Sequence, residues 1–150
     1  MTNLPKHNEG GFTIMELMIV VAILVILISL AVPSYRDFVA RSIRTQAKTT
    51  LVFVADRQEQ FFLDNKSYAN DISNLGFNSN PTYVDRDGSE VAAGSTDRVY
   101  KIQLTNTSAT TYTAEAVPQL HQATADTTCG TLSLTHSGQR SHSGSGSDCW

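Results

Sequence analysis

Positive charge, cysteine and recognisable catalytic motifs are all scarce in this sequence. The formal net charge is −3, so the chain as a whole does not attract nucleic acid or an anionic membrane. There is no nucleophile–base motif, phosphate loop or pair of catalytic carboxylates, and we expect neither an enzyme nor a cofactor. His121, His136 and His142 lack the spacing of a zinc site, so we expect surface histidines and no metal.

Only two cysteines are present, Cys129 and Cys149, and they do not form a CxxC pair. Such cysteines stay free in the cytosol and pair beyond a membrane, so the apolar segment described next favours pairing. A disulfide would close a loop of about twenty residues, worth about 3 kcal/mol in the chain-entropy model. It would staple a tail rich in Ser and Gly, or hold a surface loop for contact with another protein, or both.

One long apolar run, Leu17–Val32, dominates the first part of the chain. A helix from Phe12 to Val32 would span about 31 Å at 1.5 Å per residue, close to the roughly 30 Å of a bilayer core. The run carries one carboxylate near its start, Glu16. A charge in lipid costs about 2.5–3.5 kcal/mol, so Glu16 is a functional hypothesis; the alternative is a tolerated residue that reaches the headgroups.

The first eleven residues have no periodicity and are predicted to be a leader that is excluded from the fold. The Gly11–Phe12 step, between this leader and the apolar run, is a natural place for cleavage. The alternative is an ordinary secretory signal cut near Ser29–Ala31, but Glu16 would interrupt its apolar region and Pro33 would follow the cut closely.

We favour a C-terminal domain on the far side of the membrane from the cytoplasm, but the charges that flank the apolar run argue against this topology. Four basic residues follow the run, whereas Lys6 is the main charge before it; the four are Arg36, Arg41, Arg44 and Lys48. The positive-inside rule alone would therefore place the C-terminal domain in the cytoplasm. The cysteine pair and the family resemblance given below outweigh this argument.

After Pro33, which should kink the helix without ending it, apolar residues recur with helical spacing. They form one stripe: Tyr35, Val39, Ile43, Ala47, Leu51, Val54 and Phe61–Phe62. The charged residues, Arg44 among them, are assigned to the other faces. No strong breaker occurs before Asp64-Asn65-Lys66, so one helix is predicted from Phe12 to about Leu63.

The remainder of the chain predicts a small antiparallel sheet. Residues 65–97 are predicted to be a long loop, held by isolated apolar side chains. Alternation predicts strands at Arg98–Thr105, Thr111–Val117 and Thr131–His136, followed by a Ser/Gly/His tail. The expected fold is α+β: a long kinked N-terminal helix packed on about four antiparallel strands.

Four stretches of the sequence resemble the type IV pilin family. They are Gly11–Ala22, Ala31–Tyr35, Arg57–Ala69, and Cys129–Leu134 together with Asp148–Trp150. The first is similar to the processing site of prepilins with a class III signal. The third and fourth are most similar to minor pilins of the PilE type. Residues 70–98 carry no resemblance, and the role of this loop is unassigned.

This resemblance implies a filament subunit that is processed by a prepilin peptidase. The peptidase would cleave after Gly11 and methylate the amine of Phe12, and Glu16 would then meet the amine of a neighbouring subunit. Residues 12–33 would form the transmembrane and filament-core helix, with Pro33 at the membrane exit, and 34–150 the periplasmic domain. Further partners would be other pilins, the inner-membrane assembly platform, and lipid before assembly; the final location would be an extracellular pilus.

The resemblance leaves several functions open. A minor pilin that primes or joins assembly is favoured, with twitching motility, adhesion and DNA uptake as properties of the fibre. The alternatives are the major pilin, a type II secretion pseudopilin and, from another class, a membrane-anchored periplasmic binding protein. The basic residues after Pro33 allow nucleic acid as a partner, but a solvated or intersubunit face is the preferred account. Glycosylation motifs at Asn65 and Asn106 are short and common by chance.

Overall fold

A long helix, α1 (Ile14–Asn65), belongs to both of the units into which the chain divides, Met1–Tyr35 and Arg36–Trp150. The computed structural model describes residues 11–150, and each unit is considered by itself. The predicted leader, apart from Gly11, lies outside the described residues.

The part of α1 in the first unit is an apolar helix with a capped start. The backbone N–H of Glu16 donates to Oγ1 of Thr13 at 3.1 Å, which satisfies one of the free donors of the first turn. All residues from Gly11 to Tyr35 are exposed. Pro33 lies inside α1 without ending it, as expected. The kink stays a prediction.

In the second unit, α1 buries much of the stripe that the periodicity predicts. Ile43, Ala47, Leu51 and Val54 are all buried, and the stripe is half-buried where it reaches the end of the helix. The helix ends at Asn65, two residues later than expected. Lys66 follows with φ 58°, a left-handed residue typical of a helix end, and its N–H bonds to the carbonyl of Phe62.

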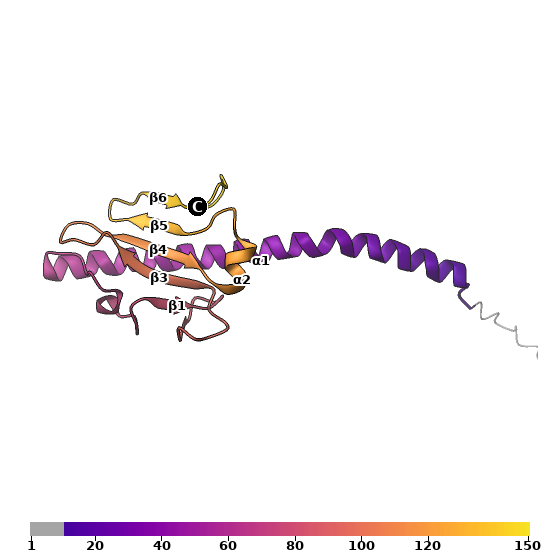
Figure 1. Ribbon diagram of the computed structural model, residues 1–150, viewed down its shortest axis with the longest axis horizontal. Coiled ribbons are helices and arrows are strands. Elements are labelled where there is room, and N and C mark those ends of the chain that lie inside the picture. The colour runs from indigo at the N-terminus through magenta and orange to yellow at the C-terminus, as the bar shows by residue number, and fades with distance from the viewer. Residues whose placement is uncertain (1–10) are drawn as a thin grey trace, which may run out of the picture. The chain divides into compact units, whose positions relative to one another are not determined.

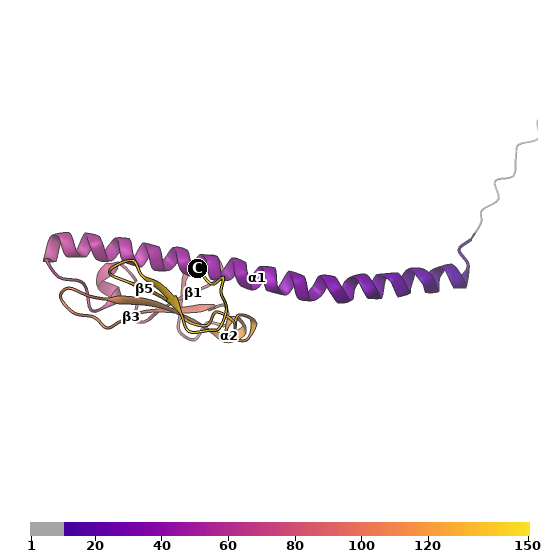
Figure 2. The same cartoon turned by 90° about the horizontal axis from the view of Figure 1, so that it is seen from above.

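A six-stranded antiparallel sheet lies along this half of α1 (Figures 1 and 2). Its strand order is β2-β1-β3-β4-β5-β6, and a 3-10 helix, η1 (Ile72–Leu75), precedes it. A short helix, α2 (Leu120–Ala125), connects β4 and β5. The strands are β1 (Thr82–Val84), β2 (Glu90–Val91), β3 (Tyr100–Thr105), β4 (Thr113–Pro118), β5 (Leu132–Thr135) and β6 (Arg140–His142).

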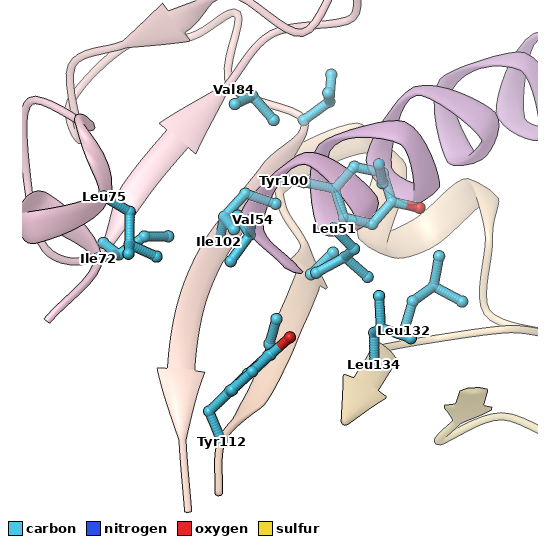
Figure 3. Close-up of a cluster of buried hydrophobic side chains, with 14 of the residues drawn as sticks. Leu51, Val54, Ile72, Leu75, Val84, Tyr100, Ile102, Tyr112, Leu132 and Leu134 are labelled. Carbon is cyan, nitrogen blue, oxygen red and sulfur yellow. The ribbon is translucent and has the colours of Figure 1, made fainter. Parts of the chain in front are cut away.

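The core of the second unit lies between α1 and one face of this sheet. Leu51 and Val54 of α1 are fully buried and face the sheet residues Tyr100, Ile102 and Leu132 (Figure 3). Alternate residues of β3, β4 and β5 supply the inward face, as the alternation predicts. The α+β prediction is therefore confirmed.

The prediction of about four strands and of one long loop over residues 65–97 is wrong in detail. That region contains η1, β1 and β2, and the Ser/Gly/His tail contains β6. These strands have only two or three residues, too few for alternation to show in the sequence. β1 lies beside β3, which is distant in the chain, with Thr82 opposite Ile102. β2 and β6 are the second strands of short hairpins, with Val84 opposite Glu90 and Leu134 opposite Arg140.

A buried glutamine fixes the chain that leaves the end of α1. Gln58 is fully buried; its Nε2 donates to the carbonyl of Ala69 at 2.9 Å, and its Oε1 accepts the N–H of Ala69 at 2.9 Å. The side chain thus pairs with Ala69 as a neighbouring strand would. Sequence analysis missed this contact because a single Gln has no periodic signal.

We expect Gln58→Ala to lower the free energy of unfolding of the second unit by about 1–3 kcal/mol, because it leaves the N–H and carbonyl of Ala69 unpaired and buried. The measurement is denaturant unfolding of the full chain in detergent. Gln60→Ala is the matched control, since Gln60 is exposed and its replacement should change stability by less than about 0.5 kcal/mol. Equal effects of the two variants would contradict the role given to Gln58.

Candidate functional site

The first candidate is the exposed apolar segment of α1. It contains one stretch that is long and apolar enough to cross a membrane, judged by length and composition. Its large side chains are about half exposed or more, from Ile14 at 82% to Val32 at 44%. So much contiguous apolar surface requires lipid or other apolar helices around it.

Glu16 lies in the first turn of this segment and is exposed. A carboxylate there is favoured by the helix dipole by about 0.3–1 kcal/mol, so Glu16 also has a local role. That role does not neutralise the charge, because no cation pairs with it among residues 11–150. A charged partner from outside the chain is compatible with this geometry.

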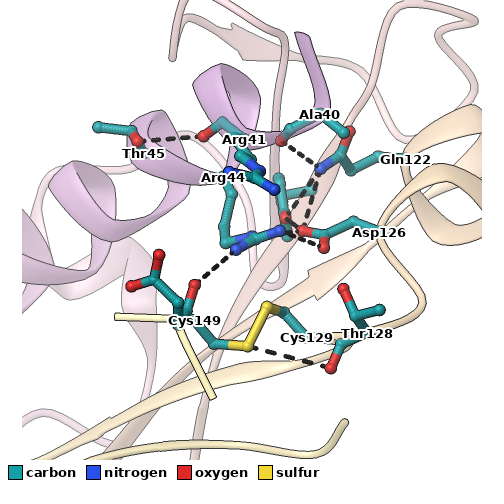
Figure 4. A network of polar contacts seen from close by, with 11 residues as sticks. Ala40, Arg41, Arg44, Thr45, Gln122, Asp126, Thr128, Cys129 and Cys149 are labelled. Carbon is teal, nitrogen blue, oxygen red and sulfur yellow. Dashed lines mark hydrogen bonds and ion pairs between the residues drawn. A yellow bond between two sulfur atoms is a disulfide. The ribbon is translucent and has the colours of Figure 1, made fainter. Parts of the chain in front are cut away.

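The second candidate is built on a buried ion pair between α1 and the end of α2. Arg44 Nε donates to Asp126 Oδ2 at 2.7 Å, and Arg44 Nη2 to Asp126 Oδ1 at 2.6 Å (Figure 4). The side chains are 9% and 1% exposed. Two parallel bonds of this kind fix both distance and orientation. The prediction that Arg44 lies on a charged outer face is wrong, because a guanidinium with a complementary carboxylate can be buried.

Two further buried polar groups complete this network. Gln122 Nε2 donates to the carbonyl of Ala40 at 3.1 Å and to the hydroxyl of Tyr100 at 3.2 Å. Burial raises the pKa of Tyr100, so its hydroxyl stays protonated. The network therefore joins α1, β3 and α2 by buried polar contacts.

The same arginine anchors both ends of the loop closed by the Cys129–Cys149 disulfide. The sulfurs are bonded across 20 residues, with the two Cα atoms 5.4 Å apart. Arg44 Nη1 donates to the carbonyl of Asp148 at 3.0 Å, next to Cys149. At the other end, the carbonyl of Asp126 accepts the N–H of Gly130, next to Cys129. The predicted pairing is confirmed, and the loop is fixed to α1.

A small groove lies where this loop meets α1. It measures about 260 Å³ and is named here the Lys48–Trp150 groove; its lining is Thr45, Lys48, Thr49, Val52, Arg140 and Trp150. The four helix residues follow the spacing of a single helix face. The indole Nε1 of Trp150 donates to the carbonyl of Ser141 at 2.7 Å, and the Arg140 guanidinium lies 5.5 Å from the ring centroid.

The groove is locally positive although the chain is acidic overall. Lys48 and Arg140 form no ion pair within the part of the chain that the structure describes. Burial and then the Arg44 charge lower the pKa of Lys48. The Asp126 carboxylate nearby is paired with Arg44, so the carboxylate of Asp148 is the main opposing charge.

Sequence analysis identified some residues of these two sites and missed others. Gly11, Phe12 and Glu16 lie at the start of the apolar segment and Pro33 at its other end, and their roles in processing and assembly stay predictions. Cys129 and Cys149 are brought together. Arg140 and Trp150 were not assigned a function, because only the folding of the loop onto α1 places them beside Lys48.

Of the predicted surface histidines, none lines the Lys48–Trp150 groove, although His121 precedes Gln122 and His142 follows Ser141. His121 and His136 are exposed and His142 is half-buried. His136 packs near the rings of Tyr68 and Tyr112. Within residues 11–150 there is no group of three or more His, Cys, Asp or Glu side chains that could hold a metal ion.

Two family models match this chain, one over its N-terminal segment and one over most of the second unit. Residues 33–133 match the family model described as "Type IV minor pilin ComP, DNA uptake sequence receptor". Residues 6–32 match the prokaryotic N-terminal methylation motif. The two matches together extend from the predicted leader to β5.

Curated relatives are type IV pilins and fimbrial proteins. The chain is 39% identical to the type IV major pilin protein PilA of Myxococcus xanthus over 90 residues, 60% of this chain and 40% of PilA. It is 52% identical to the fimbrial protein EcpC of Eikenella corrodens over 42 residues, 28% of each chain. A fimbrial protein of Pseudomonas aeruginosa is 41% identical over 58 residues, 39% of this chain and 38% of that protein. The chain thus covers less than half the length of these relatives.

We expect Arg44→Met and Asp126→Leu each to destabilise the second unit by about 3–5 kcal/mol, because each leaves the other member of a buried ion pair unpaired. The double variant Arg44→Met/Asp126→Leu should recover part of that loss, since no charge remains buried. Thermal and denaturant unfolding of the full chain in detergent measures all three. Arg41→Met, an exposed residue on the same helix, is the control. Additive losses in the double variant would contradict the pairing.

Proposed function

We propose a function from one premise: this chain belongs to the family of the type IV minor pilin ComP, DNA uptake sequence receptor. It is therefore a type IV minor pilin with an N-methylation motif. Beyond this membership, we propose that it waits in the inner membrane with residues 34–150 in the periplasm and then joins an extracellular pilus. It acts there as a structural and binding subunit and not as an enzyme.

The observation that carries this proposal is the exposed apolar segment with a lone carboxylate in its first turn. Transfer of such a helix from lipid into a bundle of like helices changes its apolar surroundings little, so assembly is feasible. Cleavage after Gly11 by a prepilin peptidase would create a cationic amine at Phe12. Glu16 of one subunit and this amine of a neighbour would then form a pair in low dielectric, which sets the register of the helices.

The second part of the proposal is that the folded unit receives DNA at the fibre surface. The family model names a DNA uptake sequence receptor, and the second unit offers unpaired cations to phosphates. Since the overall charge is −3, attraction must be local. Several relatives are named major pilins, whereas a minor pilin should be only a trace component of sheared filaments.

We expect Glu16→Ala to be processed normally but to fall about tenfold or more in sheared filaments, because breaking a buried ion pair costs about 3–5 kcal/mol. The cap contact uses the backbone N–H of Glu16, so the substitution spares it. N-terminal sequencing and intact mass of the membrane and filament fractions measure both steps. A matched control is Asp64→Ala, an exposed carboxylate near the end of α1. Efficient incorporation of the Glu16 variant would remove the pairing role.

We expect filaments assembled without this chain to retain less DNA than filaments that contain it. Retention should fall steeply with salt, as phosphate contacts release counterions. Binding of labelled DNA to sheared filaments at two or more salt concentrations measures both. Equal retention by filaments with and without the chain would leave the minor pilin assignment intact and contradict the DNA receptor role.

A further inference from the structure

We infer that the Lys48–Trp150 groove is a binding site for an unpaired DNA base and its adjacent phosphates. This inference rests on the proposed DNA receptor function. It names the binding site on the protein and specifies that the bound DNA is single-stranded. The groove lies between α1 and the disulfide loop, and its lining combines two cations with one indole ring.

The size of the groove suits one ring system. Its volume of about 260 Å³ lies below the roughly 300–1,000 Å³ of sites that enclose a drug-sized ligand. An intact duplex offers its bases only as edges within the grooves, whereas a single strand can turn one base outward. A pocket of this size beside an aromatic ring therefore favours a base from an unpaired stretch.

The aromatic part of the site is held in place before any ligand arrives. The Nε1 bond to Ser141 and the Arg140 guanidinium fix the indole of Trp150 against β6. Cys149, the residue before Trp150, is held by the disulfide, and Arg44 donates a hydrogen bond to the carbonyl of Asp148. A ring that is already ordered loses little entropy when a base stacks on it.

The charged part of the site suits a phosphate on each side of such a base. Lys48 comes from α1 and Arg140 from β6, so their charges approach the groove from two elements. Neither has an ion-pair partner among residues 11–150, so an incoming phosphate displaces no carboxylate. Proteins that bind single strands combine these two features, a positive groove and an aromatic stacking surface.

Fluorescence gives a direct test, because Trp150 is the only tryptophan in the sequence. The full chain in detergent, with its disulfide intact, is titrated with oligothymidine, with the same strand in a duplex, with an abasic strand and with inorganic phosphate. We expect oligothymidine to bind tightest and to quench Trp150 emission. The abasic strand should bind weakly without quenching, and inorganic phosphate should leave the emission unchanged.

Variants separate the stacking surface from the charges. Trp150→Leu should weaken oligothymidine binding about five- to a hundredfold, measured by anisotropy of a labelled strand, and leave the abasic strand unaffected. Lys48→Gln and Arg140→Gln should each lower the salt slope by about 0.7. Asp148→Asn should tighten binding, because it removes the opposing carboxylate. Arg86→Gln, an exposed cation elsewhere, is the matched control, and thermal unfolding checks that each variant is folded.

The outcomes distinguish this inference from the proposed function. If the chain binds DNA but Trp150 emission and the Trp150→Leu variant show no effect, the groove is overturned and the receptor role stands. Duplex binding as tight as that of the single strand, weakened equally by Trp150→Leu, would overturn the requirement for an unpaired base. If the unmodified chain binds neither duplex nor single strand, the receptor role fails as well.

Discussion

The buried pair of Arg44 and Asp126 is the constraint on which the rest of the second unit depends. It joins the long helix to the end of α2, and through Asp148 it also fixes the loop that the disulfide closes. Leu51 and Val54 pack in the centre of the apolar core, but packing alone tolerates small shifts along the helix. A guanidinium with two bonds to one carboxylate does not tolerate them, so the ion pair sets where the loop meets α1.

The two ends of α1 illustrate different solutions to burying apolar surface. After Arg36, the apolar residues of the helix that are buried pack into the core of the same chain, although Phe38 and Leu63 stay exposed. Before it, no described residue covers the apolar side chains, which therefore depend on lipid or on other subunits. A single helix thus carries an internally satisfied surface and one that is satisfied only by association, which is the requirement for a subunit that is stable alone and still assembles.

Features that rest on local sequence patterns could be predicted, whereas most features that form only on folding could not. The stripe from Ile43 to Val54 and the alternation of β3, β4 and β5 are local patterns, and all of them were predicted. Strands β2 and β6 pair with near neighbours in the chain but are too short to show alternation. Strand β1 depends on β3, and Arg44 lies 82 residues from Asp126, so these contacts have no local signal. None of the four was predicted. The N-terminal segment was predicted from its composition and motif, whereas Trp150 and Lys48 meet only after the loop folds onto α1.

The strand order places two very short strands at the edges of the sheet, which affects how neighbouring copies of the domain can pack. Its two outermost strands, β2 and β6, have only two and three residues. Long bare strand edges recruit further strands from neighbouring molecules, and short or charged ones do not. Where copies of such domains are held close together along a fibre, short outer strands offer little edge on which neighbouring sheets could pair.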